Sequence, residues 1–315
     1  MREKRSMVKE YPYGNGVVKW VSTEWLEAQL TDGGLHILDC QPNIHDYISE
    51  HLPGALFMDE GLWRIPLKGT PGAWVTAEAA QLTMRRLGLR ADMPVVVYTG
   101  KGAQKGWGDG LGQTMVSYSL ARFGHDNVLL LDGGIDKWKM EGRELTKVFP
   151  TAEESDFVAG VRSEYFVEYE ELKRLKDRED VILLDARPPD VYAGQGPWIK
   201  AGHIPGAVNL PWKSLMDGEN PALLRPGKEI QAILDEAGVT SDKTIICSCG
   251  TGREATNEFL LFKWYLGYPK VKLDEGAFTK WSSYPDNPTI AGSSPWGSQQ
   301  SLRGRRGGER CCWRE

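Results

Sequence analysis

The 315-residue sequence has no long apolar run, few cysteines and no large excess of charge of either sign. Without a run of about 18 apolar residues, no segment is expected to cross a membrane as a helix. Five cysteines in a chain of this length do not indicate a disulfide scaffold. The net charge of −5 gives no general electrostatic reason to bind nucleic acid. The charged segment Met1–Met7 is not followed by the apolar region that is typical of a secretion signal, and we expect a soluble protein.

One segment joins an apolar run to a thiol, a glycine-rich loop and a helical pattern. This segment is Ile245–Thr256, IICSCGTGREAT. A strand end would hold the sulfur of Cys249, the glycines would let backbone N–H groups point at it, and the helix N-terminus would add positive potential. Each effect favours a thiolate, so we expect the pKa of Cys249 to be lowered. The alternative is that Cys247 and Cys249 are two buried strand residues before an ordinary turn.

The first half of the chain carries a copy of this pattern without the thiol. An apolar run enters T-G-K-G within Val95–Gly102, and Thr99 stands where Cys249 stands in the second half. The segment His51–Ala55, HLPGA, recurs as His203–Ala207, HIPGA, in the same order relative to these loops. The sequence therefore predicts a duplicated domain, with one chemically active half and one supporting half.

Apolar runs alternate with helical patterns in both halves, which is typical of a mainly parallel sheet flanked by helices. In the first half, we expect strands at 35–40, 95–98 and 128–131, and helices at 77–87, at 114–123 and from a cap at Ser22. The predicted fold class is α/β, with two such domains at 17–146 and 163–285 joined by the linker 147–162. Residues 286–315 are rich in Gly, Ser and Arg and are expected to form a disordered tail.

The two halves differ in length at two places. The second half has extra residues between Asp185 and His203, among them Trp198. The first half has extra residues within 101–112, a glycine-rich stretch that contains lysines and a tryptophan. We interpret 101–112 as a surface loop, and a cover over an anionic site in the other domain is the alternative.

Three of these motifs resemble the tandem-domain rhodanese family, the thiosulfate and 3-mercaptopyruvate sulfurtransferases. The segment Tyr47–Ala55 resembles the first signature of the family, and Cys249–Glu254 resembles its six-residue active loop. The segment Val271–Trp281 resembles its C-terminal signature, except that Asp274 replaces an aromatic residue and Lys280 replaces a glutamate. The resemblance implies two rhodanese-like domains, a first domain without the catalytic cysteine, and a site between the domains.

The resemblance also implies an enzyme that transfers sulfane sulfur through a persulfide on Cys249. This covalent chemistry requires no metal and no cofactor. The expected binding residues are Gly250, Thr251, Gly252, Arg253 and Glu254 of the loop, together with Arg187, which stands where the family places a substrate-binding arginine. The alternative for Arg187 is a buried pair with Asp185. His203 is expected to brace a turn, because both halves contain this histidine and one half alone has the cysteine.

The expected partners are a small anionic sulfur donor and a thiol or cyanide acceptor, with a thioredoxin-like or sulfur-metabolism protein as a candidate acceptor. Thiosulfate is slightly preferred as donor over 3-mercaptopyruvate or polysulfide. The neutral Gly250-Thr251-Gly252 resembles the loop of the mercaptopyruvate enzymes, whereas Arg253 supplies a cation one position later. Asp190-Val191-Tyr192 stands in the place of the Gly-Arg-aromatic segment of the mercaptopyruvate enzymes, so the second carboxylate-binding arginine of that subfamily is missing. The sequence does not distinguish the cytoplasm from the periplasm.

Two alternative functions can be proposed for the same cysteine-containing loop. The spacing from Cys247 to Arg253 resembles the C-x5-R loop of cysteine phosphatases and arsenate reductases, in which the arginine clamps an oxyanion. The duplication favours Cys249 over Cys247, since Thr99 aligns with Cys249. The third hypothesis is a non-enzymatic carrier that holds a persulfide on Cys249 for a partner protein.

Overall fold

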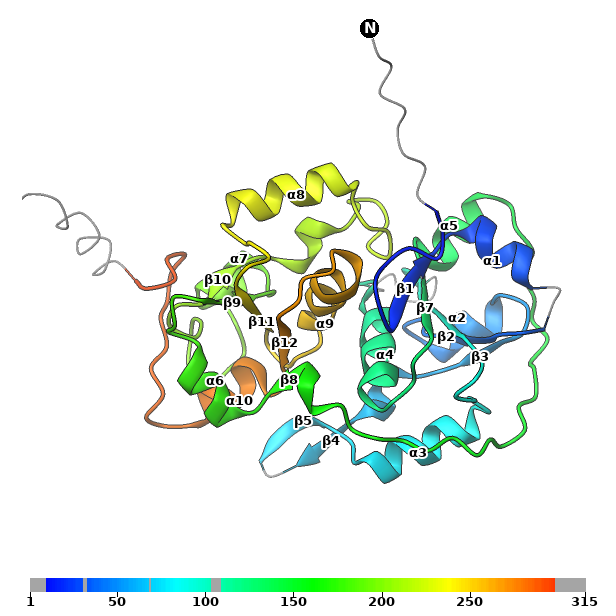
Figure 1. Ribbon diagram of the computed structural model, residues 1–315, viewed down its shortest axis with the longest axis horizontal. Helices are drawn as coiled ribbons and strands as arrows, with labels where there is room; N and C mark the ends of the chain where they lie inside the picture. The colour runs from blue at the N-terminus through cyan, green and yellow to red at the C-terminus, as the bar shows by residue number, and fades with distance from the viewer. Residues whose placement is uncertain (1–9, 31–32, 68, 103–108, 298–315) are drawn as a thin grey trace, which may run out of the picture.

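The chain folds into two five-stranded sheets that lie side by side, and the strands within each sheet are parallel (Figure 1). The computed structural model describes residues 10–30, 33–67, 69–102 and 109–297. The first sheet has the strand order β1 (Val18–Val21), β7 (Val128–Leu131), β6 (Val95–Tyr98), β2 (His36–Asp39), β3 (Ala55–Phe57). The second has the order β10 (Val208–Asn209), β9 (Val181–Asp185), β11 (Thr244–Ser248), β12 (Val271–Asp274), β8 (Phe166–Val167).

The two sheets have the same topology. Numbered along the chain, the strands of each half follow the order first, fifth, fourth, second, third across the sheet. All of these neighbours pair in parallel, as strands joined by helical crossovers do. The predicted duplication and the α/β fold class are therefore confirmed.

Helices cover both faces of each sheet (Figure 1). The helices of the first half are α1 (Thr23–Gln29), α2 (Ile44–Ser49), η1 (Glu60–Trp63), α3 (Ala77–Arg86), α4 (Leu111–Arg122) and α5 (Gly134–Met140). Those of the second half are η2 (Ser163–Tyr165), α6 (Tyr169–Leu175), α7 (Pro189–Ala193), η3 (Trp212–Leu215), α8 (Gly227–Glu236), α9 (Ala255–Leu260), its continuation η4 (Leu261–Tyr265) and α10 (Ala277–Ser283). The predicted cap is confirmed, because the Ser22 hydroxyl accepts the N–H of Trp25 at 3.1 Å.

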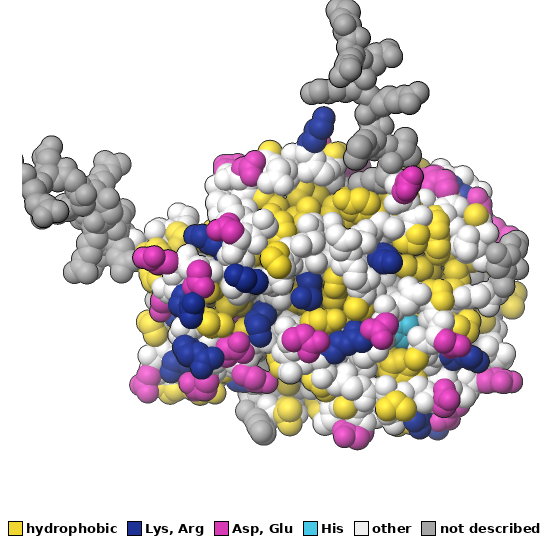
Figure 2. All heavy atoms as spheres, viewed as in Figure 1, with side chains coloured by type: hydrophobic (Ala, Val, Ile, Leu, Met, Phe, Trp, Pro, Cys, Tyr) yellow, Lys and Arg dark blue, Asp and Glu magenta, His cyan; other side chains and the backbone are white. Residues whose placement is uncertain are grey.

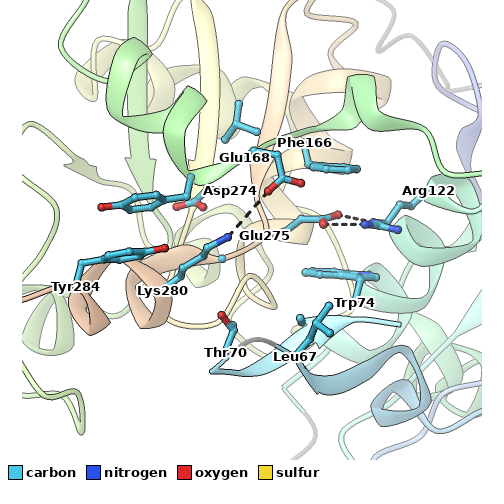
Figure 3. Close-up of a pocket in the computed structure, with 14 residues that line it drawn as sticks. Leu67, Thr70, Trp74, Arg122, Phe166, Glu168, Asp274, Glu275, Lys280 and Tyr284 are labelled. Atoms are coloured by element: carbon cyan, nitrogen blue, oxygen red, sulfur yellow. Dashed lines mark hydrogen bonds and ion pairs between the residues drawn. The ribbon is translucent and has the colours of Figure 1, made fainter. Parts of the chain in front are cut away.

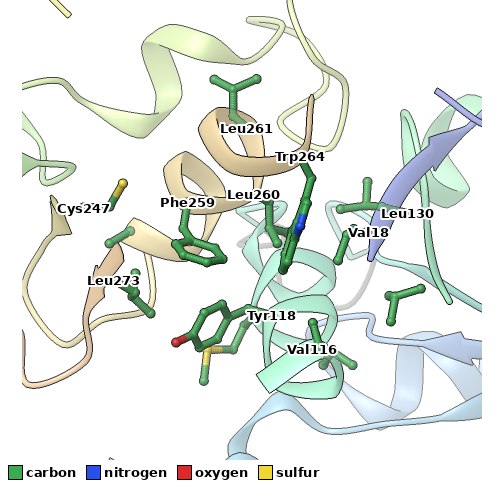
Figure 4. Packing of buried hydrophobic residues seen from close by; sticks show 14 of the residues in the cluster. Val18, Val116, Tyr118, Leu130, Cys247, Phe259, Leu260, Leu261, Trp264 and Leu273 are labelled. Atoms are coloured by element: carbon green, nitrogen blue, oxygen red, sulfur yellow. The ribbon is translucent and has the colours of Figure 1, made fainter. Parts of the chain in front are cut away.

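The two domains share one hydrophobic core, in which α4 packs against α9 (Figure 4). The ring of Tyr118 on α4 meets the ring of Phe259 on α9 edge to face, with centroids 5.1 Å apart. The hydroxyls of Thr114 and Thr256 are hydrogen-bonded across the same contact at 3.1 Å. Helix α4 is buried along its whole length, because its own sheet covers one side and α9 covers the other.

A buried ion pair joins the domains beside this core. Arg122 on α4 donates from Nε and Nη2 to the two carboxylate oxygens of Glu275 at 2.6 and 3.0 Å. The Tyr118 hydroxyl donates to the same carboxylate at 2.7 Å. Both charged side chains are largely withdrawn from water, with 9% and 14% of their surface exposed. Such a pair stabilises the interface only while both partners are present.

An antiparallel hairpin of the first domain extends beneath the second domain (Figure 1). Its strands are β4 (Arg64–Leu67) and β5 (Thr70–Trp74). The hairpin lies at a cavity of about 340 Å³ whose other walls come from β8, β12 and α10 (Figure 3). The first domain therefore contributes walls to a cleft that runs along the second.

Part of the expected tail is ordered. Ile290 forms a β-bridge with His203, and the N–H of Gly206 donates to the carbonyl of Pro295 at 2.8 Å. These hydrogen bonds hold residues 286–297 against the second domain, so a composition rich in Gly and Ser did not prevent packing. The rest of the expected tail, 298–315, and the part 103–108 of the extra loop lie outside the described residues.

The surface and the helices agree with the modest net charge and the lack of apolar runs. On the face shown in Figure 2, acidic and basic side chains lie interspersed over both domains. Among the described residues, none of the helices combines the length and apolar character needed to span a membrane.

Glu275→Gln tests the interdomain ion pair. The change should lower the free energy of unfolding by about 3 kcal/mol, because it leaves the Arg122 charge buried without its partner. Urea denaturation followed by tryptophan fluorescence measures this loss. The matched control is Glu154→Gln, which removes a carboxylate from an exposed ion pair with Arg86 and should change stability by less than about 1 kcal/mol. Equal effects of the two substitutions would show that the buried pair has no special role.

Candidate active site

The loop after β11 surrounds the sulfur of Cys249 with backbone N–H groups. The N–H of Gly252 donates to Sγ at 3.0 Å, and the N–H groups of Thr251 and Ala255 also contact the sulfur. Gly252 has a φ of +84°, a left-handed conformation that strains other residues, so the turn requires glycine here. The expected nest of N–H groups is therefore present around Cys249.

The start of α10 holds the carbonyl groups of this loop on the opposite side. The carbonyl of Cys249 accepts the N–H of Phe278 at 2.9 Å, and the carbonyl of Gly250 accepts the N–H and the hydroxyl of Thr279 at 3.0 and 2.7 Å. Asp274, which replaces an aromatic residue of the signature, organises this turn. Its carboxylate accepts the N–H of Ala277 at 3.0 Å and the hydroxyl of Ser248 at 2.8 Å.

The expectation of a lowered cysteine pKa is wrong for this structure. Burial raises the pKa of the Cys249 thiol well above its usual value, and the charge and hydrogen bond of the Glu254 carboxylate raise it further. The N–H groups of the loop oppose this shift and do not outweigh it. Cys249 is completely buried, a fact of tertiary packing that the loop sequence alone does not reveal.

Aromatic side chains close the loop from both domains. A Cβ atom placed on Gly250 would lie 2.4 Å from the ring of Trp198, so this ring occupies the space of a side chain at position 250. Trp198 belongs to the extra segment of the second half, and its indole N–H donates to the Thr279 hydroxyl at 2.8 Å. On the other side, Trp74 of the β4–β5 hairpin lies against Gly252.

Arg187 is the buried partner of Asp185. Its Nε and Nη2 donate to the Asp185 carboxylate at 2.9 and 2.6 Å, and Nη2 also donates to the carbonyl of Gly202 at 3.0 Å. The guanidinium lies beside the rings of Trp198 and Phe278. The structural pairing considered from the sequence is therefore present. The remaining nitrogen, Nη1, is buried without a partner.

The Arg253 side chain binds two carboxylates of the first domain. Its Nε donates to Glu60 at 2.6 Å, and its Nη2 donates to Asp109 at 3.0 Å. These three residues and Thr99 line a separate cavity of about 290 Å³ at the loop that corresponds to the Cys249 loop. Arg253 therefore links the loop of one half to the equivalent region of the other.

The contacts of His203 and Cys247 are structural. The Nδ1 atom of His203 is hydrogen-bonded to the carbonyl of Tyr192 at 3.1 Å, and the two rings stack at 3.7 Å. His51 makes the same contacts with Tyr47 in the first half, so the predicted bracing role is confirmed. Cys247 lies in the hydrophobic core (Figure 4), and burial raises the pKa of its thiol well above the usual value.

The sequence placed the site between the domains but did not identify the residues that the first domain contributes. Arg64 donates from Nη2 to the carbonyl of Thr251 in the Cys249 loop. Its guanidinium lies 4.2 Å from the centre of the Trp74 ring. The available signal was an arginine and a tryptophan at the two ends of a short glycine-containing hairpin, 64–74. Nothing in that pattern says which distant segment the hairpin contacts.

Comparison with known proteins agrees with this architecture. The Rhodanese-like domain family matches the chain twice, at residues 22–141 and 168–284. A protein of Synechococcus elongatus, provisionally named a thiosulfate sulfurtransferase, is 35% identical over 84% of this chain and 83% of its own length. The sulfur carrier protein TtuD of Thermus thermophilus is 29% identical over 86% of this chain and 96% of its own length.

A solved structure shows the same arrangement. The crystal structure of SseA from Escherichia coli, described as a 3-mercaptopyruvate sulfotransferase, matches with a TM-score of 0.72 and 28% identity. The match covers 82% of this chain and 98% of SseA. The family matches, the relatives and the two equivalent sheets agree: the chain belongs to the rhodanese family and is a sulfurtransferase built from tandem domains.

Proposed function

We propose that Cys249 carries the transferred sulfur as a persulfide. The observation that supports this most is the set of N–H groups around its Sγ, from Thr251, Gly252 and Ala255. A persulfide extends the thiolate by one sulfur atom and keeps its negative charge. Fixed N–H groups in a buried site stabilise such an anion without reorganising during the reaction.

The proposed reaction has two substitution steps. The Cys249 thiol first loses its proton to the Glu254 carboxylate with which it is hydrogen-bonded. The thiolate attacks the outer sulfur of thiosulfate, the sulfur–sulfur bond breaks, and sulfite leaves with the bonding pair. A thiol or cyanide acceptor then attacks the outer sulfur of the persulfide, and the Cys249 thiolate is the leaving group. Both steps are nucleophilic substitutions and involve no cofactor.

Thiosulfate remains the slightly preferred donor, ahead of 3-mercaptopyruvate and polysulfide. The name of the Synechococcus relative supports this choice. Trp198 leaves no room for a cationic side chain at position 250, and Arg253 is already bound by carboxylates of the first domain, so we expect the cation that binds the donor to come from outside the loop. Within the second domain, Arg187 is proposed to contact the donor through its unpartnered Nη1. Arg253 is proposed to act indirectly, by fixing the first domain over the loop.

A sulfur carrier is the second candidate function. The Thermus relative bears that name, and complete burial of Cys249 would protect a persulfide from stray thiols. Steady-state assays with thiosulfate and cyanide, beside assays with 3-mercaptopyruvate and a thiol, distinguish the two. Multiple turnovers with either pair indicate an enzyme acting on small donors. A single stable persulfide that is released only to a partner protein indicates a carrier.

Cys249→Ser should abolish sulfur transfer, whereas Cys247→Ser should leave most of it. The reason is that the N–H groups of the loop surround Cys249, while Cys247 packs in the core. Mass spectrometry of the donor-treated protein should locate one added sulfur on the peptide that contains the loop, and the Cys247→Ser variant should still acquire it. Transfer that survives in Cys249→Ser and disappears in Cys247→Ser would instead support the phosphatase-like assignment.

Glu254→Gln should lower the pKa of Cys249. The negative charge beside the sulfur disfavours the thiolate, so its removal makes ionisation easier and moves the alkylation midpoint to lower pH. Iodoacetamide labelling over a pH series, read on the Cys249 peptide, measures this shift. In the same samples, turnover at neutral pH should fall, because the proton acceptor is lost.

The matched control is Glu258→Gln. Glu258 is buried one helical turn further along and raises the pKa of Cys247. This substitution should leave the labelling midpoint of Cys249 close to that of the unmodified protein. An unchanged or higher midpoint in Glu254→Gln would contradict the assigned contact.

A further inference from the structure

Arg64 carries a positive charge into the site from the supporting domain and has no carboxylate partner there. Among the described residues, no carboxylate lies within ion-pair distance of its guanidinium, whereas other arginines at the site are paired. Its Nη2 is anchored on the Thr251 carbonyl. Its Nε and Nη1 are buried and have no acceptor. Two N–H-bearing nitrogens of a charged group are therefore unused beside the Cys249 loop.

An unsatisfied buried guanidinium is costly to the empty protein. Burial lowers the pKa of Arg64, and the negative charges at Cys249, Glu275, Glu60 and Glu254 oppose this shift without forming an ion pair with the guanidinium. Buried charges are normally paired or hydrogen-bonded, and exceptions concentrate at functional sites. An anion that accepts from Nε or Nη1 would offset this cost.

The other two arginines near the loop are already neutralised. Arg187 is matched by Asp185, and Arg253 is matched by Glu60 and Asp109. Glu254 adds a negative charge next to the sulfur. Of these three arginines, Arg64 is the one that has no carboxylate at ion-pair distance among the described residues, so it is the one free to pair with an anionic donor that approaches Cys249.

We propose that Arg64 of the first domain binds the oxyanion end of the sulfur donor, namely the sulfonate oxygens of thiosulfate. The inference deepens the proposed function, because it names the residue that selects an anionic donor for Cys249. Arg64 is placed to do this by two contacts. The guanidinium packs over the Trp74 ring, and its Nη2 donates a hydrogen bond to the Thr251 carbonyl in the Cys249 loop. Since Cys249 and the free nitrogens of Arg64 are both buried, a donor reaches them only when side chains that cover the loop move.

This assignment gives the supporting domain a direct part in binding substrate. The first domain lacks the thiol, because Thr99 stands at the corresponding position. Through the β4–β5 hairpin it still supplies a cation that binds the donor, in addition to Arg187 of the second domain. The second domain supplies the nucleophile and the N–H groups that hold the transferred sulfur.

Arg64→Gln should raise the Michaelis constant for thiosulfate by about tenfold to hundredfold, the range expected for loss of a charge-assisted contact. The turnover number should change less, since this contact binds ground state and transition state alike. Arg64→Lys keeps the charge, so its Michaelis constant for thiosulfate should lie between those of the unmodified protein and Arg64→Gln. The matched control is Arg90→Gln, which removes an arginine from an exposed ion pair of the same domain and should leave the kinetics unchanged.

A second donor separates binding from a structural role. Methanethiosulfonate carries one negative charge fewer than thiosulfate, because a methyl group replaces one oxygen. Loss of Arg64 should therefore raise its Michaelis constant by a smaller factor. Equal factors for the two donors, or an unchanged constant for thiosulfate, would overturn the assignment.

A binding measurement covers the case in which Arg64→Gln does not fold. Calorimetric titration of thiosulfate into Cys249→Ser and into Cys249→Ser/Arg64→Lys requires no turnover, and weaker binding to the double variant is expected. Equal binding would overturn the assignment.

The proposed function is tested separately by the added sulfur on Cys249 in the unmodified protein. If that persulfide forms while Arg64→Lys binds thiosulfate normally, the inference about Arg64 fails and the proposed function stands.

Discussion

The hydrogen bonds between the loop carbonyls and the start of α10 determine the geometry of the site. The carbonyl of Gly250, which is bound by Thr279, shares a peptide plane with the Thr251 N–H, and this binding helps to turn that N–H toward the sulfur. A loop with the same sequence but without these donors would have unsatisfied buried carbonyls. The conformation of the site therefore depends on a segment that follows the cysteine by nearly thirty residues.

The second dependence is between the two domains. Arg253 of the second domain is bound by carboxylates of the first, while Arg64 of the first binds a carbonyl of the second. Together with the Arg122–Glu275 pair, these contacts show that arginines of both domains reach across the interface. The shared core of α4 and α9 keeps the two in register, since aromatic side chains from both helices are in direct contact.

Local patterns explain why much of the fold was predictable. The repeated HLPGA and HIPGA motifs and the matching loops around Thr99 and Cys249 were sufficient to infer duplicate domains, and the structure has two equivalent sheets. The cap at Ser22 and the strand Val95–Tyr98 follow from short-range sequence alone. The nest was predictable as well, because it depends on glycines next to the cysteine.

Long-range contacts explain what was missed. The pKa of Cys249 moves in the opposite direction from the expectation, because burial and the Glu254 carboxylate act on the sulfur together. The roles of Arg64, Glu60 and Asp109 depend on which surfaces meet across the domains. The pairing of Ile290 with His203 is also a long-range contact, and it orders a segment whose composition predicted a disordered tail.

The shared core also has a consequence for any fragment of this chain. If the second half were produced alone, Phe259, Leu260 and Trp264 would lose the helix that covers them and would face water. An exposed apolar patch of that kind promotes self-association. The first half therefore covers an apolar surface of the second half that would otherwise face water.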